Sequence, residues 1–188
     1  MAPDMTSLYA DASTPRGRVV EAGRACIGLP YRWGGNVPDD GGLDCSGHLQ
    51  WSYCRGGIEP YASLYPSRLD RTARGLWDSM PDVYPAAHVL PGDASFYGAR
   101  DRAGNVIAIS HVVLVTRVAP GGFVEEVVGA SRGRRGLVDP EEARKAGAVV
   151  RAFVAGPSQP AHLYRADWIG FRRCPDDAGP PPLKELTP

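Results

Sequence analysis

A cysteine at the start of a predicted helix is the residue in this sequence best placed for covalent chemistry. Cys45 follows a glycine-rich loop and comes directly after Asp44, a residue type that caps helix N-termini. Unpaired backbone N–H groups and the helix dipole favour negative charge in the first helical turn, so they stabilise a thiolate, the nucleophilic form of cysteine. The pattern predicts a nucleophile. The alternative is a small buried apolar cysteine, which is the commoner case.

A histidine far downstream supplies a candidate general base. His111 opens an apolar run, residues 111–116 (HVVLVT), which predicts a buried β-strand with the histidine at its entrance. An imidazole is the usual base in cysteine acyl transfer, and it needs to meet the thiol only in space. The alternative is a strand-end histidine that bonds to a loop carbonyl.

Four short motifs occur in a fixed order along the chain: residues 29–35 (LPYRWGG), 42–47 (GLDCSG), 90–93 (LPGD) and 110–112 (SHV). This ordered set resembles the NlpC-type cysteine peptidases, papain-like hydrolases of bacterial cell walls, over about residues 16–172. The resemblance implies that Cys45 is the nucleophile and His111 the base. It also implies that Tyr31 helps to hold the oxyanion, and that the nucleophile helix packs against an antiparallel sheet.

The sequence departs from that family at the group that orients the base. The relatives usually place a third polar residue, most often a histidine, on the strand after the base. A turn at Pro120-Gly121 would set Val112 opposite Gly129, which has no side chain. We therefore predict a Cys45–His111 dyad whose imidazole is oriented by a backbone carbonyl, a water or the Ser131 hydroxyl. The alternative is that Gly129 marks an inactive site.

Residues around the nucleophile are expected to bind the substrate: Trp33, Asp44, Ser46 and His48. His48 is three residues after Cys45 and so lies on the same helical face. The alternative for His48 is a packed or solvated side chain with no part in binding.

Composition excludes several other functions. With 188 residues, 43% of them hydrophobic and 22% charged, the chain has the size and composition of one globular domain. Its 21 basic residues equal its 21 acidic residues, so no overall basic field favours nucleic acid, and no apolar run approaches the roughly 18–20 residues that span a bilayer. The cysteines form no C-x-x-C pair and the four histidines lack metal-type spacing, so no metal is predicted. A P-loop and a dinucleotide fingerprint are absent too, so no other cofactor is predicted.

Periodicity and turn residues predict an α+β fold in which helices come first and antiparallel strands later. The expected helices cover residues 14–27, 45–54, 67–80 and 139–146, and the expected strands cover 94–97, 111–119, 123–130, 148–154 and 162–171. Asp93 is expected to form a turn and Cys26 to lie in the core, and all four cysteines are expected to be free thiols. Residues 1–13 read as a flexible segment, 14–172 as the NlpC-type domain and 173–188 as a Pro-rich flexible tail.

The function that these features favour is hydrolysis of an amide in peptidoglycan stem peptides through a thioester. The resemblance implies the bond between D-glutamate and the diamino acid, and a monomer is expected. A related Cys/His amidase or acyltransferase, or an inactive wall-binding or phage-tail module, is the alternative. Residues 1–13 lack the basic start and apolar core of a signal peptide, so we expect delivery to the wall by lysis, by a specialised export route or by a phage particle, and we favour a bacteriophage tail or lysis role.

Overall fold

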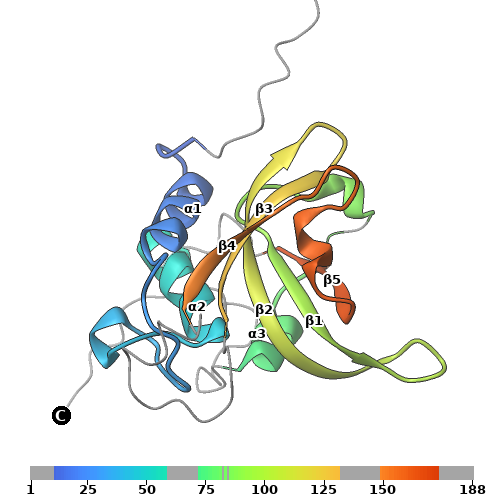
Figure 1. The fold of residues 1–188 in the computed structure, drawn as a ribbon, viewed down its shortest axis with the longest axis horizontal. Helices are drawn as coiled ribbons and strands as arrows, with labels where there is room; N and C mark the ends of the chain where they lie inside the picture. The colour runs from blue at the N-terminus through green and yellow to red at the C-terminus, as the bar shows by residue number, and fades with distance from the viewer. Residues whose placement is uncertain (1–10, 59–71, 82, 84, 132–148, 174–188) are drawn as a thin grey trace, which may run out of the picture.

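The computed structural model describes residues 11–58, 72–81, 83, 85–131 and 149–173. Within them, helices α1 (Pro15–Ala25), α2 (Cys45–Gly56) and α3 (Ala73–Ser79) precede all five strands along the chain. Figure 1 shows α1 and α2 side by side on one side of a curved sheet, with α3 near its lower end. The order of elements confirms the α+β prediction.

Local sequence explains where the helices begin and end. Thr14 caps α1, and its side-chain oxygen accepts from the backbone N–H of Gly17 at 3.0 Å. Helix α2 ends at Gly57, whose φ of 80° suits the left-handed conformation predicted for the double glycine. Helix α3, capped by Thr72, begins later than expected, and the preceding residues 67–71 lie outside the described part of the chain.

The five strands form one antiparallel sheet in the order β4-β3-β2-β1-β5: β1 (Ala94–Arg100), β2 (Val106–Ala119), β3 (Phe123–Ala130), β4 (Val150–Val154) and β5 (Trp168–Arg172). Strand β2 begins five residues before His111, because β1 and β2 continue as a hairpin that projects from the body (Figure 1). The strand predicted over 162–171 is wrong in its first half. There the chain forms a short 3₁₀ helix, η4 (Ala161–Tyr164), and only then β5. The helix predicted over 139–146 lies outside the described residues.

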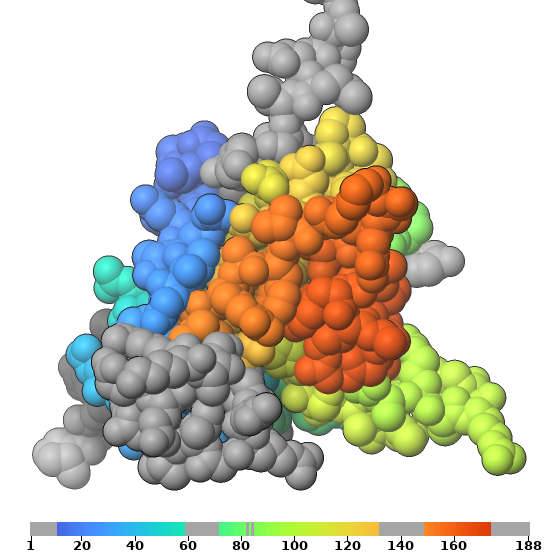
Figure 2. Space-filling model, in the orientation of Figure 1, coloured from blue at the N-terminus to red at the C-terminus, as the bar shows by residue number. Residues whose placement is uncertain are grey.

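Alternating residues of the sheet face two different cores. One core joins the sheet to the helices: Val19, Leu49, Tyr53, Leu76, Phe96, Val112 and Leu114. The other lies on the opposite face and includes the following side chains: Tyr97, Val113, Val115, Val127, Ala161 and Phe171. In Figure 2 the orange and red atoms of β4, η4 and β5 form the surface nearest the viewer. The segment that contains η4 therefore covers the sheet face that the helices leave open.

The Asp93 carboxylate links helix α1 to the residue that follows β5. Its side chain is fully buried, and Oδ2 accepts from the backbone N–H of Leu90 at 2.8 Å, which confirms the predicted turn. Arg16 of α1 donates to Oδ1 at 2.9 Å, and Arg173, which follows β5, donates to Oδ2 at 2.7 Å. Such partners are needed because a buried carboxylate without them would destabilise the folded state by roughly several kcal/mol.

Cys26 and Cys54 are the other cysteines among the described residues, and Cys174 lies outside them. Cys26 is 3% exposed and packs in a small core with Leu43 and Val150, as predicted. Cys54 is exposed, and none of the three cysteines within the described ranges forms a disulfide. No helix in the described ranges is long and apolar enough to cross a membrane.

Candidate active site

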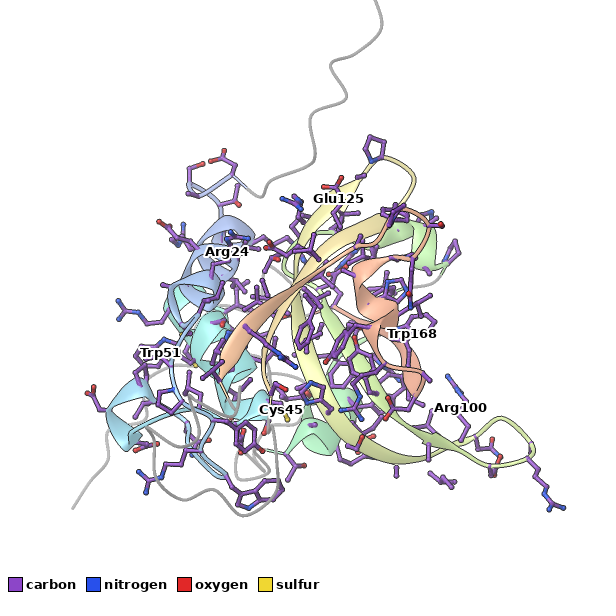
Figure 3. All side chains as sticks on the ribbon, in the orientation of Figure 1. Arg24, Cys45, Trp51, Arg100, Glu125 and Trp168 are labelled. Carbon is purple, nitrogen blue, oxygen red and sulfur yellow. The ribbon has the colours of Figure 1, made fainter. Side chains whose placement is uncertain are left out.

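Asp44 fixes the junction at which Cys45 sits. Its Oδ1 accepts from the N–H of Gly47 at 2.7 Å and from the Ser46 hydroxyl at 2.9 Å, and Oδ2 accepts from the N–H of Gly34 at 2.9 Å. The predicted N-cap is therefore confirmed, and it also holds the glycine loop against the helix. Both carboxylate oxygens of Asp44 and the Ser46 hydroxyl are engaged in hydrogen bonds at this junction. Asp44 and Ser46 therefore stabilise the start of α2, which carries the Cys45 thiol. Cys45 begins α2 beside the sheet (Figure 3).

Cys45 and His111 open into one cavity of about 440 Å³, which is lined by the following residues: Tyr31, Trp33, Cys45, Ser110, His111, Ser131, Arg151, Tyr164 and Arg165. Tyr31 and Trp33, both expected at the site, therefore lie in its wall. Trp33 is 75% exposed, so its ring is available to a ligand at the mouth. The thiol and the imidazole come from residues far apart in sequence, and the fold brings them to the same opening.

His48 does not belong to this cavity, and its predicted role in substrate binding is wrong. Its side chain is fully buried, and Nε2 lies 3.0 Å from the carbonyl oxygen of Gly23 in α1. A residue three positions along a helix is offset around the helix axis from the first. That offset turns His48 toward α1, whereas Cys45 faces the opening.

An irregularity in the sheet precedes His111. Tyr97 pairs with His111 and Gly98 pairs with Ile109, so Ser110 is an extra residue on β2, a β-bulge. Bulges redirect neighbouring side chains and are common next to active sites. Before the bulge β2 is largely exposed, and from His111 onward it is buried, with His111 itself 8% exposed. The predicted place of His111, at the entrance of a buried run, is confirmed.

The imidazole of His111 is held by an aromatic frame. Its Nε2 lies 2.9 Å from the hydroxyl oxygen of Tyr164 in η4. The Tyr164 ring stacks on Phe153 at 3.8 Å between centroids and meets Tyr97 edge-on at 5.3 Å. Tyr97 also contacts the His111 ring, at 5.6 Å between centroids. The nitrogen left for a thiol is therefore Nδ1.

Tyr164 occupies the place that we expected a carbonyl, a water or Ser131 to fill. The Ser131 hydroxyl instead accepts from Nη2 of Arg151 at 3.3 Å. The register predicted for the hairpin is also wrong by one residue, because Leu114 pairs with Val128 and the turn has three residues rather than two. Gly129 therefore lies beside Val113, whose Cγ1 would be only 2.4 Å from a Cβ at that position.

The surroundings keep both reactive groups neutral in the free protein. Burial is the main cause that raises the pKa of Cys45 to about 11, and the Asp44 carboxylate raises it further. Backbone hydrogen bonds from Val112 and Ser46 lower this pKa, but they do not offset the rise. Burial, with help from the nearby Arg165 cation, lowers the pKa of His111 to about 3. The predicted stabilisation of a resting thiolate is therefore outweighed, and at neutral pH the pair is a thiol and an imidazole.

Two arginines give the cavity a positive rim. Arg165 is paired with Asp167 at 2.6 Å, whereas Arg151 has no carboxylate partner among the described residues. The Arg151 guanidinium lies over the Phe153 ring at 4.7 Å and hydrogen-bonds to Ser131. Arginine in such a place can bind a carboxylate through two parallel hydrogen bonds.

Residues 28–116, which include both Cys45 and His111, match the NlpC/P60 family. This stretch belongs to the NlpC/P60 family. It ends before Gly129, Arg151 and Tyr164, so the match covers the nucleophile and the base but not the group that contacts the base.

The names of two similar proteins state hydrolytic activities. The bifunctional muramidase/DL-endopeptidase CwlT of Bacillus subtilis (strain 168) is 55% identical over 85 residues, which cover 45% of this chain and 22% of that protein. A gamma-DL-glutamyl hydrolase of the same strain is 31% identical over 104 residues, covering 55% of this chain and 22% of that protein. The chain thus spans about a fifth of the length of these two relatives.

Solved structures share the fold. NlpC2 from Trichomonas vaginalis superposes with a TM-score of 0.57 at 21% identity, covering 88% of this chain and 49% of that chain. The P60 domain of an antigen from M. avium subspecies paratuberculosis gives 0.52 at 18% identity, covering 85% of this chain and 93% of that chain. At such identities the likeness concerns the fold alone, and it confirms the papain-like architecture predicted from the motifs.

Sequence reasoning missed the residues that complete the cavity after β3. The sequence predicts strands over 162–171, which contains Tyr164 and Arg165, and over 148–154, which contains Arg151, and it assigns none of the three a functional role. An imperfect signal was present, because residues 157–160 (PSQP) contain two prolines that interrupt strand pairing. The sequence offered nothing that would place the Tyr164 hydroxyl next to His111.

Proposed function

We propose that this NlpC/P60 domain hydrolyses an amide bond in peptidoglycan stem peptides by covalent catalysis at Cys45. The observation that carries the proposal is the shared cavity into which the thiol of Cys45 and the imidazole of His111 both open. The names of the similar proteins support a peptidoglycan substrate. Tyr31 and the backbone N–H of Cys45 are the proposed donors to the oxyanion.

The reaction proceeds by concerted proton transfer, since the resting pair is neutral. As the sulfur of Cys45 bonds to the substrate carbonyl carbon, its proton passes to Nδ1 of His111. Collapse of the tetrahedral adduct breaks the C–N bond, and the imidazolium returns that proton to the leaving amine. A water then attacks the thioester carbon while His111 takes one of its protons. The C–S bond breaks, the sulfur regains that proton from His111, and the released carboxylic acid ionises to a carboxylate in water.

The bond proposed for cleavage is the one between D-glutamate and the diamino acid. When that bond forms through the glutamate side chain, the α-carboxylate of the same residue stays free and anionic. Arg151, at the rim of the cavity and without a carboxylate partner in the described part of the chain, has the chemistry to bind it. The names of the DL-endopeptidase and the gamma-DL-glutamyl hydrolase agree with such a bond.

Mass spectrometry of wall fragments released from purified peptidoglycan tests the proposal. Cys45→Ala should abolish release of new fragments while the protein remains folded, because no other thiol among the described residues lines the cavity. Cys54→Ala, which removes an exposed thiol on the same helix, is the matched control and should keep wild-type activity.

Two outcomes would contradict the proposal. Fragments that still accumulate with Cys45→Ala would exclude Cys45 as the nucleophile. A wild-type protein that binds walls but releases nothing would favour a non-catalytic wall-binding module, and products with a new acyl acceptor in place of water would indicate an acyltransferase.

A further inference from the structure

We propose that Tyr164 is the positioning residue for His111. It orients the imidazole from η4, whereas strand β3 has only Gly129, which has no side chain, at the corresponding position. The catalytic meaning of this role rests on the proposed function. The placement itself does not, because it concerns a contact between two side chains that can be measured without substrate.

The geometry points to a built interaction. The Tyr164 hydroxyl oxygen lies 2.9 Å from Nε2 of His111, which is an ordinary hydrogen-bond length. Tyr164 is restrained by its stack on Phe153, with 12° between the ring planes, and by its edge contact with Tyr97. Tyr97 is in turn fixed, because its hydroxyl donates to the carbonyl oxygen of His162 in η4 at 2.8 Å. Two strands and η4 thus fix the position of the Tyr164 hydroxyl oxygen.

The neighbouring strand cannot supply the same contact. Gly129 has no side chain, and a Cβ there would meet Val113 Cγ1 at 2.4 Å and Val113 Cβ at 3.0 Å. Real Cβ atoms do not approach other heavy atoms so closely, and Val113 is β-branched and held in the core, so it has little freedom to yield. Ser131, just beyond β3, is engaged by Arg151.

The direction of the hydrogen bond decides whether His111 can act as a base. If Nε2–H donates to the Tyr164 oxygen, the lone pair is on Nδ1, where it can accept the thiol proton. If the Tyr164 hydroxyl donates to Nε2, the proton is on Nδ1 and the base is blocked. A hydroxyl can do either, so the positioning role requires Nε2 to carry the proton. The charged and titratable groups that act on the imidazole are Arg165, Asp167 and His48, and none of them hydrogen-bonds to Nε2.

NMR of the ring nitrogens in protein with isotopically labelled histidine tests the contact without substrate. His111→Gln assigns the His111 signals. In the wild type at neutral pH we expect Nε2 to be protonated and Nδ1 to be unprotonated. In Tyr164→Phe, which keeps the ring and its stacking, the Nε2 signal should shift. Unprotonated Nε2 in the wild type, or an unchanged signal in Tyr164→Phe, would overturn the proposal.

Kinetics on a synthetic stem peptide test the consequence. Tyr164→Phe should lower kcat about tenfold, the rate equivalent of one neutral hydrogen bond, with little change in KM. Tyr53→Phe is the matched control, because it also removes a buried hydroxyl that donates to a backbone carbonyl, that of Gly92 at 2.6 Å, in the core away from the cavity. It should cost stability but leave kcat per folded molecule unchanged.

The two experiments fail in different ways. A wild type that hydrolyses no wall peptide but shows the expected Nε2 signals would remove the proposed function and leave the positioning contact standing. Equal kcat values in Tyr164→Phe and the wild type would overturn the positioning role while the hydrolase stands.

Discussion

At the scale of single residues, the site combines a half-buried thiol with a buried imidazole, and the surrounding groups keep both of them neutral. Burial is the main reason that the pKa of Cys45 is raised and that of His111 lowered. The next influence on each is a single charged residue, Asp44 for the thiol and Arg165 for the imidazole. Asp44 is needed for the helix cap, so Arg165 is the neighbour whose charge can be removed with less damage to the fold.

Arg165→Gln should move the acid limb of the pH–activity profile to higher pH. The Arg165 cation disfavours the imidazolium, and its removal also leaves the Asp167 carboxylate, which favours that form, without its partner. Both changes raise the pKa of His111. Because only the neutral imidazole can accept the thiol proton, activity then disappears at a higher pH on acidification.

The measurement is kcat/KM of a stem peptide from pH 3 to pH 8 in constant ionic strength. Arg102→Gln, in the exposed turn between β1 and β2, serves as the control for loss of one positive charge and should leave the profile in place. A limb that moves to lower pH in Arg165→Gln would show that the cation does not act on His111.

At the scale of elements, the β2–β3 hairpin determines which side chains can surround His111. Gly121 and Gly122, with φ of 82° and 81°, form a three-residue turn with Pro120, and Ala119 pairs with Phe123. One residue more in the turn shifts the whole of β3 by one position relative to β2. That shift places Gly129 beside Val113, on the face that carries His111.

Gly129→Ala should lower the free energy of unfolding by about 1–3 kcal/mol, because the added methyl group overpacks against Val113. Urea denaturation followed by circular dichroism gives the value. Gly156→Ala is the matched control, since nothing lies within 4 Å of a Cβ there, and it should change stability little. Gly129→His should fail more severely, and any gain of activity from it would contradict the close contact.

Much of this arrangement was accessible from the sequence, for reasons that concern local physics. The Asp44 cap, the Gly57 stop and the burial change at His111 depend on neighbours in the chain. The exact hairpin register depended on the turn having three residues, which PGG does not reveal. The contact between Tyr164 and His111 spans 53 residues and depends on how η4 folds back over the sheet, which no local pattern specifies.

At the scale of the whole molecule, one buried carboxylate connects the first helix, the turn before β1 and the residue after β5. Asp93→Asn should destabilise the protein by about 3–5 kcal/mol, because two arginine side chains lose their shared partner in a desolvated place. Asp78→Asn breaks an exposed pair with Arg74 and should leave the free energy of unfolding near that of the wild type. Urea denaturation of both variants makes the comparison, and equal small losses would show that the Asp93 cluster contributes no more than a surface pair.

The same cluster bears on how the domain would respond to mechanical tension. Among the described strands β5 pairs with β1, with Arg172 opposite Ala94, and on its other side the Phe171 carbonyl accepts from the N–H of Val83 at 3.1 Å, so a pull on the chain beyond β5 would separate the strand from the Arg172 end. Arg173 donates to the Asp93 carboxylate at the end where this separation would start, and Arg16 of α1 donates to the same carboxylate. Tension along the chain would therefore act on the Arg173–Asp93 ion pair and on the backbone hydrogen bond from Arg173 to Pro81 before it reaches the hydrogen bonds of β5, and the rupture force of Asp93→Asn should fall even where the sheet itself is intact.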